Sequence, residues 1–108
     1  MKTLYENSIV SLVGFAARAR KLVQGFTSVE RSVKRKNAKL VILDPQAGET
    51  TKKRIEALCS RVGVPVVFLP KGFSMEDILG KPNCRCAGVT DSGFSEAILQ
   101  RTKESQCK

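Results

Sequence analysis

The amino-acid sequence predicts an α/β protein, a three-layer α/β/α sandwich in which helices cover both faces of one sheet. Helix-like and strand-like patterns alternate along the 108 residues, and a sheet between two helix layers buries the apolar side of every such element. The clearest strand is LVIL at residues 40–43, an unbroken apolar run typical of a strand buried on both faces. Neither an internal repeat nor a linker is visible. We therefore expect one domain over residues 1–108, with a polar, frayed tail from about residue 102.

The elements ahead of LVIL are a helix, a short strand and a second helix. The first helix is expected over residues 5–19, because apolar side chains recur there at the spacing of one helix face. Those side chains are Ile9, Leu12, Val13 and Ala16. A strand at residues 21–23 follows. The second helix should run to about residue 36, with Thr27 or Ser28 as its N-cap, since a hydroxyl accepts a hydrogen bond from a free first-turn amide.

The elements after LVIL repeat the alternation. They are a helix over residues 49–61, a strand over 64–69, a short helix over 74–79, a strand over 86–89 and a last helix from about residue 92. Gly63 is placed to end the first of these helices. Ser74 begins the short one, and Thr90 or Asp91 caps the last. The inward faces of the two longer helices are expected to hold Ile55, Leu58, Cys59 and Val62, and then Phe94, Ala97 and Ile98.

The cysteines do not predict a metal site. They are Cys59, Cys84, Cys86 and Cys107, in a chain without histidine. A zinc site usually needs two closely spaced pairs, whereas this chain has one CxC and two distant single cysteines. Structural disulfides are not expected in a cytosolic protein. Cys59 shares an apolar helix stripe and should be buried and unreactive, whereas Cys107 in the polar tail should be exposed.

The sequence argues against an enzyme. Without histidine there is no Ser-His or Cys-His pair, and the glycines form neither of the common nucleotide-binding loops. We therefore expect no cofactor and no small-molecule substrate, although a ligand at the carboxyl ends of the strands would revive that reading. No signal peptide and no apolar run of about 20 residues is visible, so we expect a cytoplasmic protein with no membrane partner.

Positive charge is the main functional signal. The net charge is +9, and residues 1–54 hold 12 Lys and Arg against 4 acidic residues, whereas residues 55–108 hold 7 against 6. A uniformly basic surface would serve solubility alone. Here the excess is one-sided and flanks Gly25, where backbone can approach a ligand closely, and the start of a helix, whose free amides favour phosphate. This distribution favours a polyanionic partner.

Five stretches resemble a known family over residues 8–100: LVGFAARARKLVQG, AKLVILD, ETTKKRIEALC, VGVPVVFL and CAGVTDSGFSEAIL. Together they are similar to the ribosomal-protein superfamily that binds kink-turn RNA, which includes the archaeal seven-A-e and eukaryotic thirty-e proteins. The small bacterial YlxQ-like branch is the most similar. The resemblance implies a mixed four-stranded sheet and RNA binding without catalysis. The implied partner is structured RNA, either ribosomal RNA or a kink-turn-like fold, with the ribosome as one setting.

The resemblance also implies where RNA is bound. In the family, a turn with a Gly-x-Asn-Glu-like motif and a lysine three residues later grips the tandem G·A pairs of the kink. This chain places Gly25 and Arg31 at the matching ends of that motif. Thr27 and Ser28 depart from the Asn-Glu type, and Ser28 offers one short acceptor oxygen where glutamate offers two. Arg20 stands where many bacterial relatives have glycine.

The second implied contact is the loop before the last strand, Gly80–Arg85, which is more basic than apolar in this chain. We expect one continuous face from Arg18 through Lys36 to that loop. Its predicted RNA-binding residues are Arg20, Lys21, Gln24, Gly25, Phe26, Thr27, Ser28, Arg31, Lys34, Arg35, Lys81, Pro82, Asn83 and Arg85. The alternative is a protein-interaction module that has kept the fold and lost specific kink-turn recognition.

Overall fold

The computed structural model describes the backbone of residues 4–70, 72–81 and 84–106, and the side chains of residues 8–70, 72–81 and 84–102. The elements in chain order are α1 (Leu4–Arg18), β1 (Leu22–Gln24), α2 (Phe26–Lys34), β2 (Leu40–Leu43), α3 (Glu49–Val62), β3 (Val66–Phe68), α4 (Met75–Leu79), β4 (Cys86–Val89) and α5 (Ser92–Gln106). Every element expected from the sequence is present, with ends shifted by at most a few residues. No helix within these ranges is long and apolar enough to cross a membrane.

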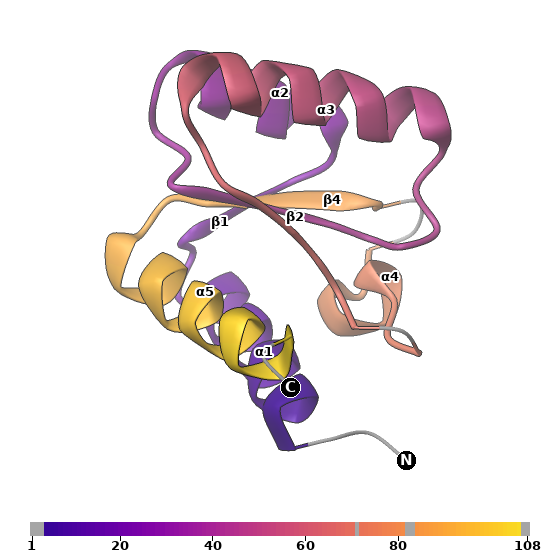
Figure 1. Ribbon diagram of the computed structural model, residues 1–108, viewed down its shortest axis with the longest axis vertical. Helices are drawn as coiled ribbons and strands as arrows, with labels where there is room; N and C mark the ends of the chain where they lie inside the picture. Colours follow the sequence, from indigo (N-terminus) through magenta and orange to yellow (C-terminus); the bar gives the residue numbers. More distant parts are fainter. Residues whose placement is uncertain (1–3, 71, 82–83, 107–108) are drawn as a thin grey trace.

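The strands form one mixed four-stranded sheet in the order β1-β4-β2-β3. Strand β4 is antiparallel to both β1 and β2, whereas β2 and β3 are parallel. Helices α2 and α3 cover one face of this sheet and α1 and α5 cover the other, with α4 beside the second layer (Figure 1). The predicted three-layer α/β/α sandwich is confirmed.

Strand β2 separates two apolar clusters, one on each face of the sheet. All four of its residues are buried. Leu40 and Ile42 belong to the cluster under α1 and α5, while Val41 and Leu43 belong to the cluster under α2 and α3. Successive side chains of a strand point to opposite faces, so an unbroken apolar run is what a strand covered on both sides requires.

Local sequence signals correctly predicted three helix ends. Gly63 ends α3 in the left-handed region, with φ of 96°. The Ser74 hydroxyl accepts from the Asp77 amide at 3.0 Å, which caps α4. Asp91 caps α5, since its Oδ2 accepts from the Phe94 amide at 2.9 Å. Each of these contacts joins residues close in sequence, and for that reason a local pattern predicts it.

The expected frayed tail is not seen at residue 102. Helix α5 continues to Gln106, and Thr102 is buried, with its hydroxyl donating to the Ile98 carbonyl at 2.9 Å. This bond from a residue to the carbonyl four positions earlier satisfies the hydroxyl within the helix. A polar residue can therefore lie on the buried side of α5.

Three cysteines, Cys59, Cys84 and Cys86, are free and buried. Burial raises the pKa of the Cys86 thiol to about 12, with smaller contributions from Cys84 and Cys59. The Cys84 thiol donates to the Cys86 carbonyl, at 3.4 Å from Sγ to O. Within the described residues, no three His, Cys, Asp or Glu side chains are grouped to hold a metal ion. Cys107 lies outside the described residues.

Cys59 is expected to resist thiol reagents in the native protein. It is fully buried, and burial raises the pKa of its thiol to about 11. The reactive thiolate is therefore scarce at pH 8, and a reagent has no access to the sulfur until the protein opens. Labelling followed by mass spectrometry should show Cys59 modified at least 100-fold more slowly in buffer than in concentrated urea. Equal rates in the two conditions would contradict the burial.

Candidate nucleic-acid interface

Gly25 forms a turn whose outer side is open. Its φ of 92° and ψ of 157° lie in a region that is essentially restricted to glycine. The Gly25 amide donates to the Cys86 carbonyl at 3.0 Å, and the Gly25 carbonyl accepts from the Val29 amide at 3.0 Å. A Cβ built on Gly25 would meet no atom within 4 Å. The turn is thus fixed to β4 on its inner side and accessible on its outer side.

The N-terminus of α2 has no side-chain cap. Gly25 is its N-cap, no side chain makes a capping hydrogen bond, and the first turn contains no acidic residue. The prediction of Thr27 or Ser28 as the N-cap is therefore wrong, and both residues lie inside the first turn. The hydroxyl residues Thr27 and Ser28 suggested a cap two or three positions too late. Gly25 takes the cap position instead, in a backbone conformation that other residues rarely adopt. The uncapped amides and the positive end of the helix dipole form an arrangement suited to an anion.

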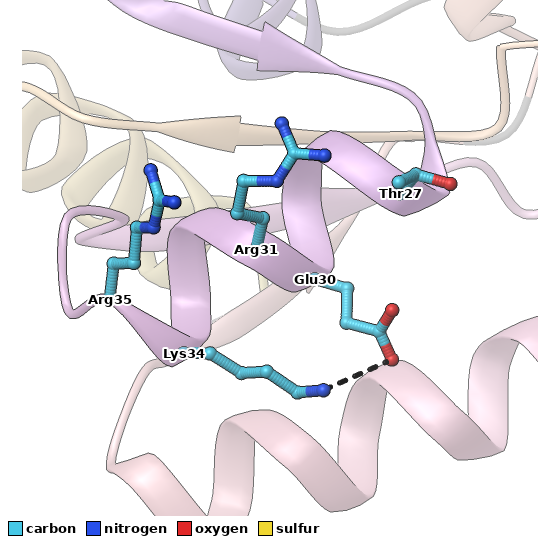
Figure 2. A pocket seen from close by; sticks show the side chains of 5 residues that line it. All are labelled: Thr27, Glu30, Arg31, Lys34 and Arg35. Carbon is cyan, nitrogen blue, oxygen red and sulfur yellow. Dashed lines mark ion pairs between the residues drawn. The ribbon is translucent and has the colours of Figure 1, made fainter.

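The charged residues of α2 divide into two rows. Figure 2 shows Arg31 and Arg35 pointing to one side of the helix, while Glu30 and Lys34 point toward α3. With Thr27 these four residues line a hollow of about 370 Å³. Residues four apart lie on the same side of a helix, so the two arginines present their guanidinium groups together.

Glu30 neutralises part of the charge on the α3 side. Its Oε2 lies 3.9 Å from Lys34 Nζ and 3.5 Å from Arg54 Nη2. The Arg54 guanidinium also stacks over the Phe26 ring, 4.7 Å from the ring centre. Phe26 packs against the apolar cluster under α2 and α3. Of the residues predicted to bind RNA, Lys34 and Phe26 therefore have partners within the protein, whereas no ion pair to Arg31 is seen among the described residues.

The loop before β4 ends beside the Gly25 turn and strand β2. The Gly25 amide donates a hydrogen bond to the Cys86 carbonyl, and the neighbouring Arg85 carbonyl accepts one from the Asp44 amide at 2.8 Å. Lys81 is exposed. The Arg85 guanidinium lies 3.4 Å from a Glu76 carboxylate oxygen, with both side chains about one-third exposed. The predicted contacts Pro82 and Asn83 lie outside the described residues.

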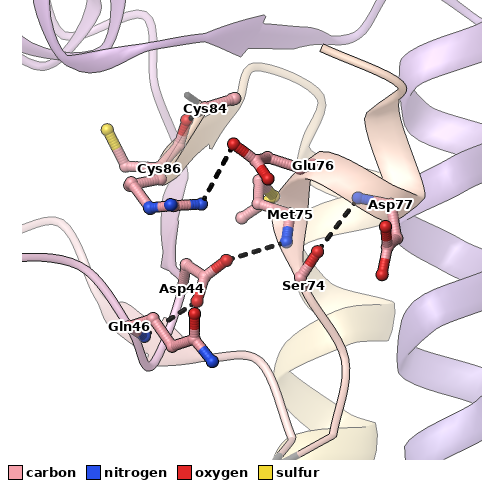
Figure 3. A network of polar contacts seen from close by, with 9 residues as sticks. Asp44, Gln46, Ser74, Met75, Glu76, Asp77, Cys84 and Cys86 are labelled. Atoms are coloured by element: carbon pink, nitrogen blue, oxygen red, sulfur yellow. Dashed lines mark hydrogen bonds and ion pairs between the residues drawn. The ribbon is translucent and has the colours of Figure 1, made fainter. Parts of the chain in front are cut away.

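Asp44 holds α4 against the end of β2, a role that no local sequence pattern predicted. It is fully buried. Its carboxylate accepts from the amides of Gln46 at 2.8 Å and Met75 at 2.9 Å (Figure 3). Met75 begins α4, so this bond fixes the helix that leads into the Gly80–Arg85 loop. The position of Asp44 directly after a fully buried strand could have indicated a buried carboxylate. Its partner Met75 could not be predicted, because it lies 31 positions further along the chain.

Of the remaining predicted residues, Gln24 lies beside the Gly25 turn, whereas Lys21 and Arg20 lie at the other end of β1. Gln24 pairs with Ala87 in the β1–β4 ladder. The Lys21 carbonyl accepts from the Thr90 amide, and so places Lys21 and the preceding Arg20 near the end of β4. Arg18 does not share this surface. Its guanidinium stacks over Phe15, 5.1 Å from the ring centre, and it lines a hollow between α1 and α4. The predicted face therefore does not begin at Arg18, because α1 belongs to the layer opposite α2.

An α/β/α domain with an open, uncapped helix start and arginines on the same helix has a surface suited to an anionic partner. The chain belongs to the ribosomal protein L7Ae/L30e/S12e/Gadd45 family, whose sequence pattern matches residues 7–99. The resemblance noted from the sequence is thus confirmed.

Two curated relatives match most of the chain. A protein named "RNA-binding protein YlxQ" from Enterococcus faecium is 32% identical over 88% of this chain and 87% of its own length. The Bacillus subtilis protein of the same name is 32% identical over 82% of this chain and 88% of its own length. These matches place the chain in the bacterial YlxQ branch of the family.

Solved structures show the same fold. A Bacillus halodurans protein of unknown function superposes with a TM-score of 0.81 at 34% identity, over 88% of this chain and 96% of its own. The Giardia lamblia 15.5kD RNA binding protein superposes with a TM-score of 0.75 over 96% of this chain and 89% of its own. At 17% identity, the second likeness carries the fold alone.

Proposed function

We propose that this protein is a cytoplasmic, non-catalytic RNA-binding protein that recognises structured RNA of the ribosomal or kink-turn type. The observation that carries the proposal is the open Gly25 turn, which exposes the uncapped amides of α2 next to Arg31. The names of the YlxQ relatives support RNA as the anion. So does the net charge of +9.

In the proposed complex the turn makes contacts through its backbone, and the long side chain of Arg31 contacts RNA atoms further from the protein. First-turn amides would donate to a phosphate or to acceptor atoms on a base. A side chain at position 25 would obstruct that approach, and glycine has none. Arg31 can donate two parallel hydrogen bonds to a guanine edge or contact a phosphate. Ser28 is half-buried in the first turn and presents a single hydroxyl to the groove of the RNA. Lys81 and Arg85 would extend the contact from the neighbouring loop.

Ser28→Glu is expected to strengthen binding to a kink-turn and to weaken binding to a plain duplex. A glutamate at this position accepts from two guanine groups at a kink, as the family motif implies, whereas an added negative charge repels any other RNA. We expect the ratio of the two affinities to change by about tenfold, or roughly 1.4 kcal/mol, which is within the range for a good base contact. The measurement is the Kd of wild type and Ser28→Glu for a kink-turn RNA and a duplex of equal length.

The matched control is Ser60→Glu, which adds the same charge at an exposed position of α3. It should lower both affinities slightly and equally. Wild-type affinity for both RNAs should also fall steeply with salt, since displaced counterions drive the binding. If Ser28→Glu weakens both RNAs equally, the family grip is absent at this position and the protein is a general RNA binder.

A second candidate function is a protein-interaction module on the same fold, supported by the hollow between α1 and α4. Phe15 is 50% exposed there, in a hollow of about 400 Å³ that Phe73 and Ile78 also line. Gly14 also lines it, and a Cβ on Gly14 would meet only the Arg18 side chain at 4.0 Å. The absence of salt-dependent binding to a folded RNA would favour this candidate over the first.

A further inference from the structure

A second hollow beside α2, on the sheet side of Arg31 and Arg35, is called the second hollow below. It has a volume of about 220 Å³ and shares these two arginines with the hollow of Figure 2. Its other lining residues come from α2, from β1 and from the ends of α2 and β4; they are Val23, Ser28, Ser32, Asn37 and Thr90. The two hollows therefore lie on either side of one arginine row.

The lining of this second hollow has the chemistry of a phosphate site. It contains two guanidinium groups, three hydroxyls and one carboxamide, and none of its lining residues is acidic. Guanidinium and hydroxyl groups are the side chains that most often donate to phosphate oxygens. Dry apolar pockets and metal sites need apolar or acidic linings instead.

The Ser32 hydroxyl lacks a partner within the described protein. Ser32 is 6% exposed, and its oxygen makes no hydrogen bond. Buried hydroxyls in proteins are nearly always bonded, so an unpaired one calls for a specific explanation. A bound anion beside Arg31 and Arg35 provides an acceptor for this donor.

Two cations precede residues that line the second hollow or that bond to its lining, and both have left-handed backbone conformations. Arg20 and Lys36 have φ of 61° and 62°, and they are the described non-glycine residues with positive φ. Lys36 directly precedes Asn37 in the lining. Arg20 precedes Lys21, whose carbonyl accepts from the amide of Thr90, also in the lining. Glycine would relieve this strain at either position, so the positive charges stand where backbone stability alone favours glycine. Both residues close the end of a helix, since the Lys21 amide donates to the Ala16 carbonyl and the Asn37 amide to the Ser32 carbonyl, and a left-handed residue is usual in such a turn.

We propose that this second hollow binds a phosphate group of the RNA backbone, apart from the contact at the Gly25 turn. The inference rests on the proposed function and extends it. Helix α2 has 9 residues, so its two ends are about 13 Å apart at 1.5 Å per residue. The bound strand would follow α2 from the Gly25 turn to Asn37, with one contact at the turn and one phosphate in the second hollow, which extends along the helix from Ser28 to Asn37. Arg20 and Lys36 add attraction beside the second phosphate.

The test replaces Asn37 with aspartate, which keeps the shape of the side chain and adds a negative charge to the hollow. The control is Gln100→Glu, the equivalent change at an exposed position of α5 in the opposite layer. For Asn37→Asp, the slope of log K against log salt should fall by about one unit, as expected for one lost phosphate contact. Its affinity for the RNA at low salt should fall about tenfold. Gln100→Glu should leave the slope unchanged. Equal slopes for the two variants would overturn the second phosphate site.

Two further measurements separate this inference from the function on which it rests. If wild type shows no RNA binding, both the function and the RNA-phosphate site fail. If wild type binds RNA but Asn37→Asp behaves like Gln100→Glu, only the second site fails. NMR titration with inorganic phosphate at constant ionic strength then identifies the source of the ligand. Saturable shifts at the Asn37 and Thr90 amides that are lost in Asn37→Asp show that free phosphate suffices. Chemical-shift changes that appear on addition of RNA but not of inorganic phosphate show that the site takes backbone phosphate only.

Arg20→Gly gives an independent prediction for the same surface. Glycine relieves the strain at φ of 61°, so the variant should be more stable than wild type, with a midpoint of thermal unfolding several degrees higher. The same variant should bind RNA more weakly, by about threefold, because one cation is lost. Lys53→Ala, an exposed cation of α3, is the control for loss of charge. An Arg20→Gly variant with higher stability and unchanged RNA affinity would remove Arg20 from the site.

Discussion

Gly25→Val is expected to abolish measurable RNA binding, with a rise in Kd of at least 100-fold. The residue has φ of 92°, where a β-branched side chain costs about 1–3 kcal/mol in strain. The new side chain would also project into the open space outside the turn, where no protein atom lies within 4 Å. In the proposed complex that space belongs to RNA. The measurement combines RNA affinity with urea unfolding.

Gly63 offers a matched control for the backbone strain. It has φ of 96°, and a Cβ there would also meet no atom within 4 Å, but it ends α3, and no residue predicted to bind RNA lies beside it in the sequence. Gly63→Val should lose a similar amount of stability and keep its RNA affinity. If both valine variants lose affinity in proportion to stability, the Gly25 turn has a structural role alone.

Asp44→Ala is expected to lower the free energy of unfolding by about 2–4 kcal/mol. The change removes two hydrogen bonds to a buried charged acceptor and leaves the amides of Gln46 and Met75 without that partner. Those bonds measure 2.8 Å and 2.9 Å, and the second one fixes the start of α4. Urea unfolding monitored by circular dichroism gives the difference directly.

Asp77→Ala is the control, since Asp77 is an exposed carboxylate in the first turn of α4. Its loss removes only a favourable interaction with the helix dipole and should cost less than about 1 kcal/mol. Asp44→Asn, which keeps one acceptor oxygen, should fall between the two. Equal stability of Asp44→Ala and Asp77→Ala would show that the buried carboxylate does not hold α4.

The sequence predicted those features that depend on near neighbours. LVIL, the apolar helix stripes, Gly63 and Asp91 all act through contacts within a few positions, and all were found as expected. Features that join distant positions could not be predicted in the same way. Glu30 meets Arg54 across 24 positions, so the sequence did not reveal which basic side chains of α2 are neutralised.

The candidate interface shows the same division. Gly25 was predicted to be special, but its role as the N-cap depends on a bond to Cys86 far along the chain. Arg18 was included in the predicted face because residues 1–54 carry most of the excess positive charge. The chain crosses from one layer to the other between α1 and α2, through β1 (Figure 1). A run of positive residues that spans such a crossing is divided between two surfaces.

The bond from the Gly25 amide to the Cys86 carbonyl has a consequence for motion. Because it continues the β1–β4 ladder by one step, the turn cannot shift without opening hydrogen bonds of the sheet itself. Hydrogen exchange at such an amide follows the slow opening of core strands rather than the fast motions of surface loops. A turn held in this way offers a partner one fixed shape. Under the proposed function, it is then the RNA that bends to match the protein, and RNAs already kinked in solution are favoured over those that must be deformed.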